Sequence, residues 1–220
     1  MRRDLLPLLQ KEFRTEFREK AAFSAAFLLS FAALVSLAQA AYNEKLNTSL
    51  AAGLFWVAMN FAAVVSLPRS FVGEEDQGTF DLLRLTARPE SVFLAKYLFC
   101  VAQVLLAAIV LGALFFPLVG MEIKGYGVML LSILGGAMSL AGSVCLCGAL
   151  VTKASNRHLL ASAIATPLVI PIIVMGVQST RAALGYPQSD GGMMSSLGIV
   201  CYGVLTATVG PTLFAWTWKN

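Results

Sequence analysis

The segment from Arg69 to Glu90, RSFVGEEDQGTFDLLRLTARPE, holds the residues of this chain whose types and spacing could do chemistry. Within it, Gly73 to Gly78 match the first half of the phosphate-binding pattern G-x-x-x-x-G-K-[ST], in which backbone N–H groups and a lysine hold nucleotide phosphates. Here the lysine is missing, Thr79 follows directly, and three consecutive carboxylates would repel a phosphate. The segment is therefore not expected to bind ATP.

The four cysteines are the other candidate ligands, and all of them fall in apolar runs: Cys100, Cys145, Cys147 and Cys201. Positions 145 and 147 lie about 200° apart around a helix, so they could not readily share a metal ion. The chain also lacks the cluster of His, Asp, Glu or Cys that a membrane enzyme would need. We therefore expect a non-catalytic protein without a metal site or a disulfide.

The elements that must position these residues follow from the composition. The chain is 58% hydrophobic and 13% charged, and its mean hydropathy is +0.76, whereas soluble domains are about 25% charged. Each of six runs without charged residues is long enough to cross a hydrocarbon core of about 30 Å as a helix, and such runs are too continuously apolar for barrel strands. We expect one all-α transmembrane domain over residues 1–220, with spans at 21–43, 46–68, 97–121, 125–152, 159–180 and 191–218.

The cations indicate how these spans are oriented, because Lys and Arg near span ends are retained on the cytoplasmic side. Of the 16 Lys and Arg residues, only Lys45, Lys124 and Arg181 flank one set of span ends, and all the others flank the opposite set. Both termini and the segment 69–96 are therefore expected in the cytoplasm. The net charge of +4 follows from this distribution, so no nucleic-acid role is expected.

Two short helices are predicted outside the spans. In residues 1–20, Leu6, Leu9, Phe13 and Phe17 recur at helical spacing among cations, which predicts an interfacial amphipathic helix on anionic lipid, although a short solvated helix remains an alternative. In TFDLLRL, from Thr79 as N-cap to Leu85, a short amphipathic helix would expose its leucines unless a partner covers them. The following helix is expected to begin at Pro89 and Glu90.

The fourth run carries small residues every three to four positions, and the fifth carries Pro167 and Pro171 one turn apart. Small residues allow helix backbones to approach closely, while each proline removes an intrahelical hydrogen bond and favours a kink. Whether the close contact is internal or between subunits is left open. The expected packing residues are Gly135, Gly136, Ser139 and Gly142.

The segment GEEDQGTFDLLRLTARPE, placed after SLPRSF, resembles the cytoplasmic segment of ABC-2-type exporter permeases, and most closely that of the haem exporter protein B family of cytochrome c maturation. TKASNRHLLASAIATPLVIPIIVMGVQST, residues 152–180, is similar to the same family's fourth loop and fifth span. The resemblance extends over nearly the whole chain.

This resemblance implies a permease subunit of the bacterial inner membrane that pairs with a separate ABC ATPase; no directly bound cofactor is assigned, and cofactor-binding residues are unknown. A coupling helix would sit in a groove of the ATPase, and two copies, or one copy with another permease, would be needed. Further implied partners are a haem-handling membrane protein, a small membrane subunit and a periplasmic haem chaperone. The implied ATPase-coupling residues are Glu74, Glu75, Gly78, Thr79, Phe80, Leu82 and Leu83.

The resemblance places ATP on the partner and makes haem a possible cargo, but it leaves open whether haem crosses this subunit or whether ATP energy releases haem-loaded chaperone. His158, the single histidine, is expected to be an interfacial or loop residue, since the implied haem ligands lie on partners. The alternative function is an ABC-2-type exporter of a lipid, polysaccharide or drug. A secondary transporter is disfavoured because its coupling would require ionisable groups within the spans.

Overall fold

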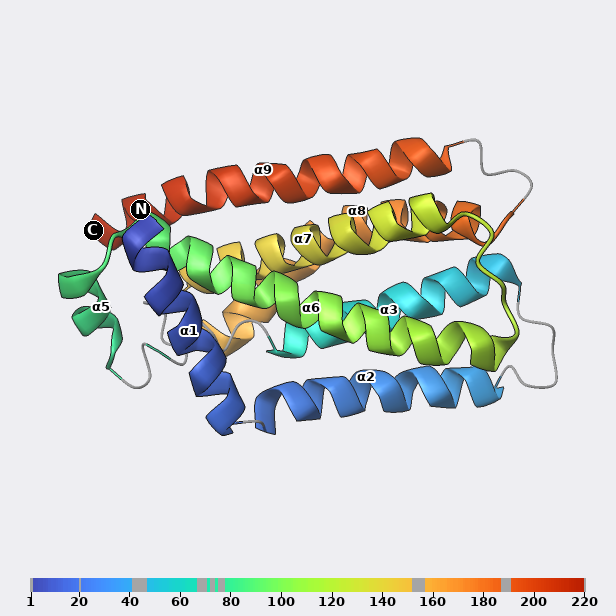
Figure 1. Ribbon diagram of the computed structural model, residues 1–220, viewed down its shortest axis with the longest axis horizontal. Helices are drawn as coiled ribbons and strands as arrows, with labels where there is room; N and C mark the ends of the chain where they lie inside the picture. Colours follow the sequence, from blue (N-terminus) through green and yellow to red (C-terminus); the bar gives the residue numbers. More distant parts are fainter. Residues whose placement is uncertain are drawn as a thin grey trace.

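The computed structural model describes residues 2–19, 21–40, 47–66, 71, 74, 78–151, 157–186 and 191–219. In these ranges the chain consists of helices and short connections, without a strand, and the predicted all-α fold is confirmed there. Long helices run side by side in an elongated bundle (Figure 1). They are α2 (Ala21–Ala40), α3 (Thr48–Ser66), α6 (Pro89–Val119), α7 (Tyr126–Leu150), α8 (Arg157–Ala183) and α9 (Gly192–Lys219).

Two further helices lie at one end of this bundle (Figure 1). Helix α1 (Arg2–Glu19) is inclined to the bundle and packs against α6 and α2. Helix α5 (Phe80–Thr86) lies beyond the end of the bundle, where the first and last helices also have their outer ends (Figure 1). The connection from α6 to α7 lies at the opposite end (Figure 1).

Four helices in the described part of the chain contain stretches long and apolar enough to cross a membrane: Pro89–Val119, Tyr126–Leu150, Ala163–Ala183 and Gly192–Trp218. The described apolar stretches of α2 and α3, Phe27–Ser36 and Thr48–Val64, are shorter. The chain is therefore a multi-pass membrane protein with four candidate spans among the described residues, and the count of six remains a prediction.

Helix α6 begins at Pro89, as the sequence predicts, because proline at the first helical position loses no intrahelical hydrogen bond and Glu90 faces the positive end of the helix dipole. The helix begins before residue 97, where the third apolar run starts, because no residue between 89 and 97 breaks a helix. Its 31 residues extend about 46 Å, more than a hydrocarbon core of about 30 Å. Part of α6 therefore has room to project beyond the membrane towards α5.

Helix α7 packs against α6, α8 and α9 and lies closest to α9. The Ser139 hydroxyl donates a hydrogen bond of 2.7 Å to the Ile199 carbonyl. A Cβ on Gly135 would lie 2.8 Å from Val200 Cγ2, and one on Gly142 would lie 2.1 Å from Thr206 Oγ1. These small residues make contacts within one chain, where α9 approaches α7 too closely for larger side chains.

Candidate functional site

Just before helix α5, Gly78 and Thr79 lie close to Glu74. Gly78 adopts a left-handed φ of +66°, which favours glycine, and the Thr79 N–H donates a 3.0 Å hydrogen bond to the Glu74 carbonyl. The helix then begins at Phe80 and ends at Thr86. Thr79 occupies the N-cap position, as predicted, but its side chain makes no capping hydrogen bond, because its hydroxyl turns back to Glu74, 3.2 Å from both the carbonyl oxygen and Oε2.

The described leucines of α5 face in opposite directions. Leu83 is buried, with 7% of its surface exposed, whereas Leu85 is 87% exposed. The Arg84 guanidinium carbon lies 5.7 Å from the centre of the Trp218 ring on α9, within the range of a cation–π contact. Leu83 therefore contributes to holding α5 on the protein, while Leu85 is available to a partner.

The remaining predicted coupling residues are placed only in part. Phe80 and Leu82 belong to α5 by their backbone, and their side chains lie outside what the structure describes. Glu75 lies outside the described residues altogether. Of the predicted set, the structure brings Glu74, Gly78 and Thr79 together in one turn and puts Leu83 in the following helix.

Behind this turn, four charged side chains form what we call the Lys96 cluster: Lys11 and Glu12 of α1, Glu74, and Lys96 of α6. The Lys96 ammonium donates hydrogen bonds of 2.9 Å to Glu12 Oε1 and 3.1 Å to Glu74 Oε1, and Lys11 pairs with the same Glu74 oxygen. The Lys96 side chain is only 1% exposed. A buried ammonium is tolerated only when it is paired and hydrogen-bonded, as it is here.

The electrostatics of Glu74 follow from this placement. Burial alone would raise the pKa of the Glu74 carboxyl, but the positive charges of Lys96 and Lys11, with their hydrogen bonds, outweigh it and lower the pKa below its ordinary value. Glu74 is therefore ionised at neutral pH. In that form the carboxylate can only accept hydrogen bonds, which suits a position between two lysines.

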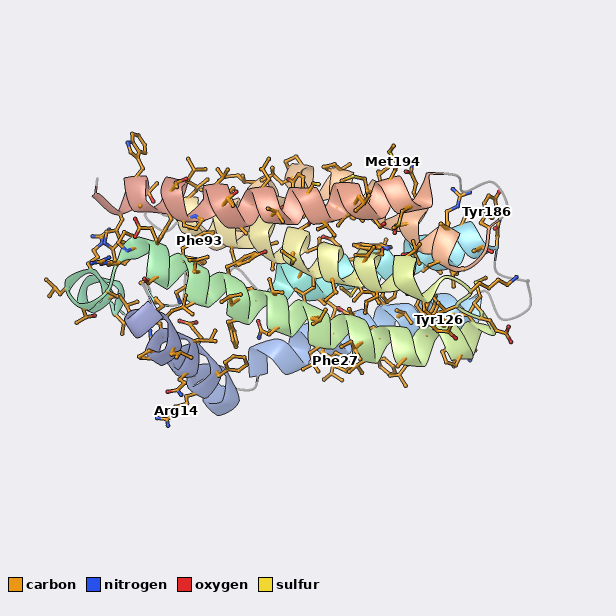
Figure 2. The ribbon with its side chains drawn as sticks, turned by 45° about the horizontal axis from the view of Figure 1, so that its top comes forward. Arg14, Phe27, Phe93, Tyr126, Tyr186 and Met194 are labelled. Carbon is orange, nitrogen blue, oxygen red and sulfur yellow. The ribbon has the colours of Figure 1, made fainter. Side chains whose placement is uncertain are left out.

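On the side of the Lys96 cluster that faces the bundle lies the aromatic ring of Phe71. Lys96 Nζ lies 5.4 Å from the ring centre of Phe71, which is fully buried. The Phe71 ring centre lies 5.8 Å from that of Phe93 on α6 and 5.5 Å from that of Phe214 on α9. Phe93 lies at the α5 end of the bundle (Figure 2). Phe71 is thus packed against both α6 and α9.

Sequence reasoning did not identify Lys96 and Glu12 as members of this site. In the sequence, Lys96 directly precedes the third apolar run, and Glu12 is one of several charged residues before the first. The two are separated by 84 positions, and charge alone does not show which of several acids a lysine will meet. The available signal was a lysine flanked on both sides by apolar sequence, since such a residue needs a carboxylate partner once it is buried.

No ligand-binding cluster stands out among the described residues, where no three His, Cys, Asp or Glu side chains are close enough to hold a metal ion. Cys100, Cys145 and Cys147 are buried and Cys201 is exposed, all four as free thiols. The backbone of His158 lies in the first turn of α8. A shallow apolar groove of about 370 Å³, lined by residues that include Phe116, Met121, Tyr126 and Met129, lies where α6 ends and α7 begins, opposite α5.

Comparison with known proteins agrees with the resemblance carried by the segment around α5. "Heme exporter protein B" of Pseudomonas aeruginosa is 33% identical over 189 residues, covering 83% of each chain. The proteins of that name from Bradyrhizobium diazoefficiens and Haemophilus influenzae are 25% identical over 172 residues and 28% identical over 165 residues, covering 76% and 74% of this chain and 74% of each relative. A family model described as CcmB protein matches residues 3–217, and the chain therefore belongs to the CcmB protein family.

Proposed function

We propose that this chain is the membrane permease subunit of an ABC transporter complex that acts in cytochrome c maturation. The complex would export haem or use ATP to release a haem-loaded chaperone. The observation that supports this most directly is α5, a short helix outside the bundle with an exposed leucine, in a chain whose relatives are named "Heme exporter protein B". ATP hydrolysis belongs to a separate ATPase subunit, because residues 73–79 lack the lysine of a phosphate loop.

The permease has six spans, with α2 and α3 completing the four long apolar helices, in the bacterial inner membrane. Helices α2 and α3 are 20 and 19 residues long, about the length that crosses a hydrocarbon core, and both pack against α6. Helix α5 and the outer ends of α1 and α9 face the cytoplasm. Two copies of the chain, or one copy with another permease, form the transporter.

The ATPase docks on the outward face of α5. Leu85 is the described apolar side chain that an ATPase groove could cover. By the family resemblance, Glu75, Phe80 and Leu82 also belong to the coupling surface, while Glu74 and Leu83 hold α5 in position. Closure of two ATPase subunits on ATP would move two such helices and tilt the spans attached to them.

Leu85→Asp tests this docking surface. Leu85 makes almost no contact within the chain, so the variant should insert normally, yet recovery of the ATPase with the tagged chain should fall by about tenfold, as expected for an interface anchor. Met194→Asp is the matched control, because Met194 is 80% exposed and lies at the far end of the bundle (Figure 2). Full recovery of the ATPase with Leu85→Asp would sink the assignment of α5 as coupling helix.

The cargo requires a separate measurement. The tagged chain is purified from native membranes, its partners are identified by mass, and the absorption spectrum is inspected for haem. An ATPase together with a haem-handling membrane protein is the expected result. An ATPase without any haem protein would instead favour the ABC-2-type exporter of a lipid, polysaccharide or drug.

A further inference from the structure

Helix α1 is tied to the protein by more than an apolar face. Leu5, Leu8, Leu9 and Glu12 are spaced i, i+3, i+4 and i+7, and all four are partly buried, so Glu12 lies on the inward face. A helix that only rested on lipid would place an apolar residue at that position. Glu12 instead reaches Lys96 of α6, and the Phe13 ring packs edge-on against Phe99 of the same helix, with ring centres 5.1 Å apart.

The Lys96 cluster also connects α1 to the turn that carries α5. Lys11 and Lys96 share Glu74 Oε1, and the Glu74 backbone accepts the hydrogen bond from Thr79 at the start of α5. Removing one partner from a buried ion pair leaves an uncompensated charge, which is strongly destabilising. The cluster is therefore expected to move as a unit, because partial opening would strand the Lys96 ammonium away from water.

The order of the helices along the chain extends the connection between α1 and the turn before α5 to α2. Helix α5 leads directly into α6, whereas α2 is far from α5 along the sequence. Helix α1, however, ends at Glu19 and α2 begins at Ala21. A single residue separates the two helices along the chain, so a displacement of α1 is passed to α2 over a short connection.

We infer that α1 is a second coupling element, which the Lys96 cluster locks to the turn before α5 and to α6. Motion of α5 then reaches α6 through the chain and α2 through α1. Glu12 and Lys96 are positioning residues in this device, since neither faces the docking surface around Leu85. This inference rests on the proposed function, because it needs an ATPase that moves α5.

Distances in the intact complex test the inference. Spin labels are placed at Arg14→Cys on α1 and Thr86→Cys on α5, both exposed, in a Cys201→Ser background, because Cys201 is the exposed native thiol. A second pair joins position 86 to Met194→Cys at the far end of the bundle. Complexes are isolated through a tag on the ATPase, so that only docked chains are measured, with and without trapping by ATP and vanadate.

With the cluster intact, the distance between positions 86 and 194 should change on trapping, while the distance between 14 and 86 should stay constant. In the Lys96→Met variant, the distribution of distances between positions 14 and 86 should broaden, and its centre should shift, on trapping. The inference would be overturned if the distance between positions 14 and 86 stayed constant in Lys96→Met, or if it changed in the protein with the intact cluster. Failure to isolate an ATPase, or an unchanged distance between 86 and 194, would count against the proposed function instead.

A milder variant gives an independent readout. Glu12→Gln should leave the ATPase bound, because Leu85 is untouched, yet lower cytochrome c maturation per folded chain by about tenfold. Lys96→Arg should keep most of the maturation, since it retains the charge, and Arg14→Met is the control because Arg14 is exposed and points away from the bundle (Figure 2). Normal maturation with Glu12→Gln would contradict the coupling role of α1.

Discussion

At the residue scale, the acidic segment before α5 has two different tasks. Glu74 turns inward and neutralises two lysines, one of which is buried in α6. An unpaired ammonium buried there would cost several kcal/mol, so Lys96 needs carboxylate partners, and Glu74 supplies one of them beside Glu12. The acids of this segment are therefore not all directed at a partner, and Glu74 serves the fold.

The lowered pKa of Glu74 predicts a defined loss of stability in acid. A carboxyl whose folded pKa lies below its ordinary value of 4.5 contributes stability that is present above that value and is lost as the pH falls through the folded pKa. Glu74→Gln should lower the melting temperature at pH 7 and reduce the further drop that follows as the pH falls below 4.5. Thermal unfolding in detergent across this range measures both effects.

Glu122→Gln is the control for the acid experiment, because Glu122 is exposed at the opposite end of the bundle. It should follow the unmodified protein at every pH. An identical acid dependence in Glu74→Gln and the unmodified protein would show that Glu74 does not supply this stability.

Gly78 offers a second test at the residue scale. Its φ of +66° is costly for any residue with a Cβ, although a Cβ there would touch no atom within 4 Å. Gly78→Ala should therefore destabilise the protein by about 1–2 kcal/mol through backbone strain alone. Gly53→Ala is the matched control, because Gly53 lies inside α3 with equally open space and should gain about 1 kcal/mol in helix propensity. Melting temperatures that move in the same direction in both variants would contradict this account.

At the element scale, α7 holds the bundle together by presenting different small residues to different neighbours. Gly135, Ser139 and Gly142 face α9, but Gly136 faces the Trp56 ring of α3. The Trp56 ring also lies against Gly176 of α8, and its indole N–H donates a 2.9 Å hydrogen bond to Thr180 Oγ1. Trp56 thus joins α3, α7 and α8 at one point that has no room for an added methyl group.

Gly136→Ala should therefore destabilise the bundle. The new Cβ would lie 2.3 Å from Trp56 Cη2, and a fully buried ring fixed by a hydrogen bond cannot move aside cheaply, so we expect a loss of about 1–3 kcal/mol. Gly127→Ala, in the first turn of the same helix and with no atom within 4 Å, should have little effect. The midpoint of thermal unfolding in detergent distinguishes the two, and equal midpoints would contradict the tight contact.

The same helices show which structural features can be predicted from patterns in the sequence. Local signals located α5 and the start of α6, because proline and a short apolar cluster act within a few residues. They could not assign the outward face of α5, since leucines stand on more than one side of a seven-residue helix. The partners of Lys96 and of Gly136 were also beyond reach, because each lies on a helix far away in sequence and depends on how the bundle packs.

At the scale of the whole molecule, the distribution of cations and the arrangement of the helices distinguish the same two ends of the bundle. Helix α5 lies at the same end of the bundle as the outer ends of α1 and α9, while Tyr126 and Tyr186 lie at the other end (Figures 1 and 2). At that other end Arg181 stacks on Tyr186, with its guanidinium carbon 4.3 Å from the ring centre. An aromatic ring and a cation together suit the interface of a membrane.

This polarity predicts which ends are reached from which side of the membrane. A reporter fused after Lys219 should report cytoplasm, because the cation-rich ends of the spans are retained there. In intact cells with a permeable outer membrane, an impermeant thiol reagent should label Tyr126→Cys, whose parent side chain is 75% exposed, and should leave Arg14→Cys on α1, also exposed, unlabelled until the inner membrane is opened. The test is sharp because both positions are accessible in the folded chain and differ only in the end of the bundle they occupy. A periplasmic signal from the reporter, or labelling of position 14 in intact cells, would invert the topology and remove α5 from the reach of a cytoplasmic ATPase.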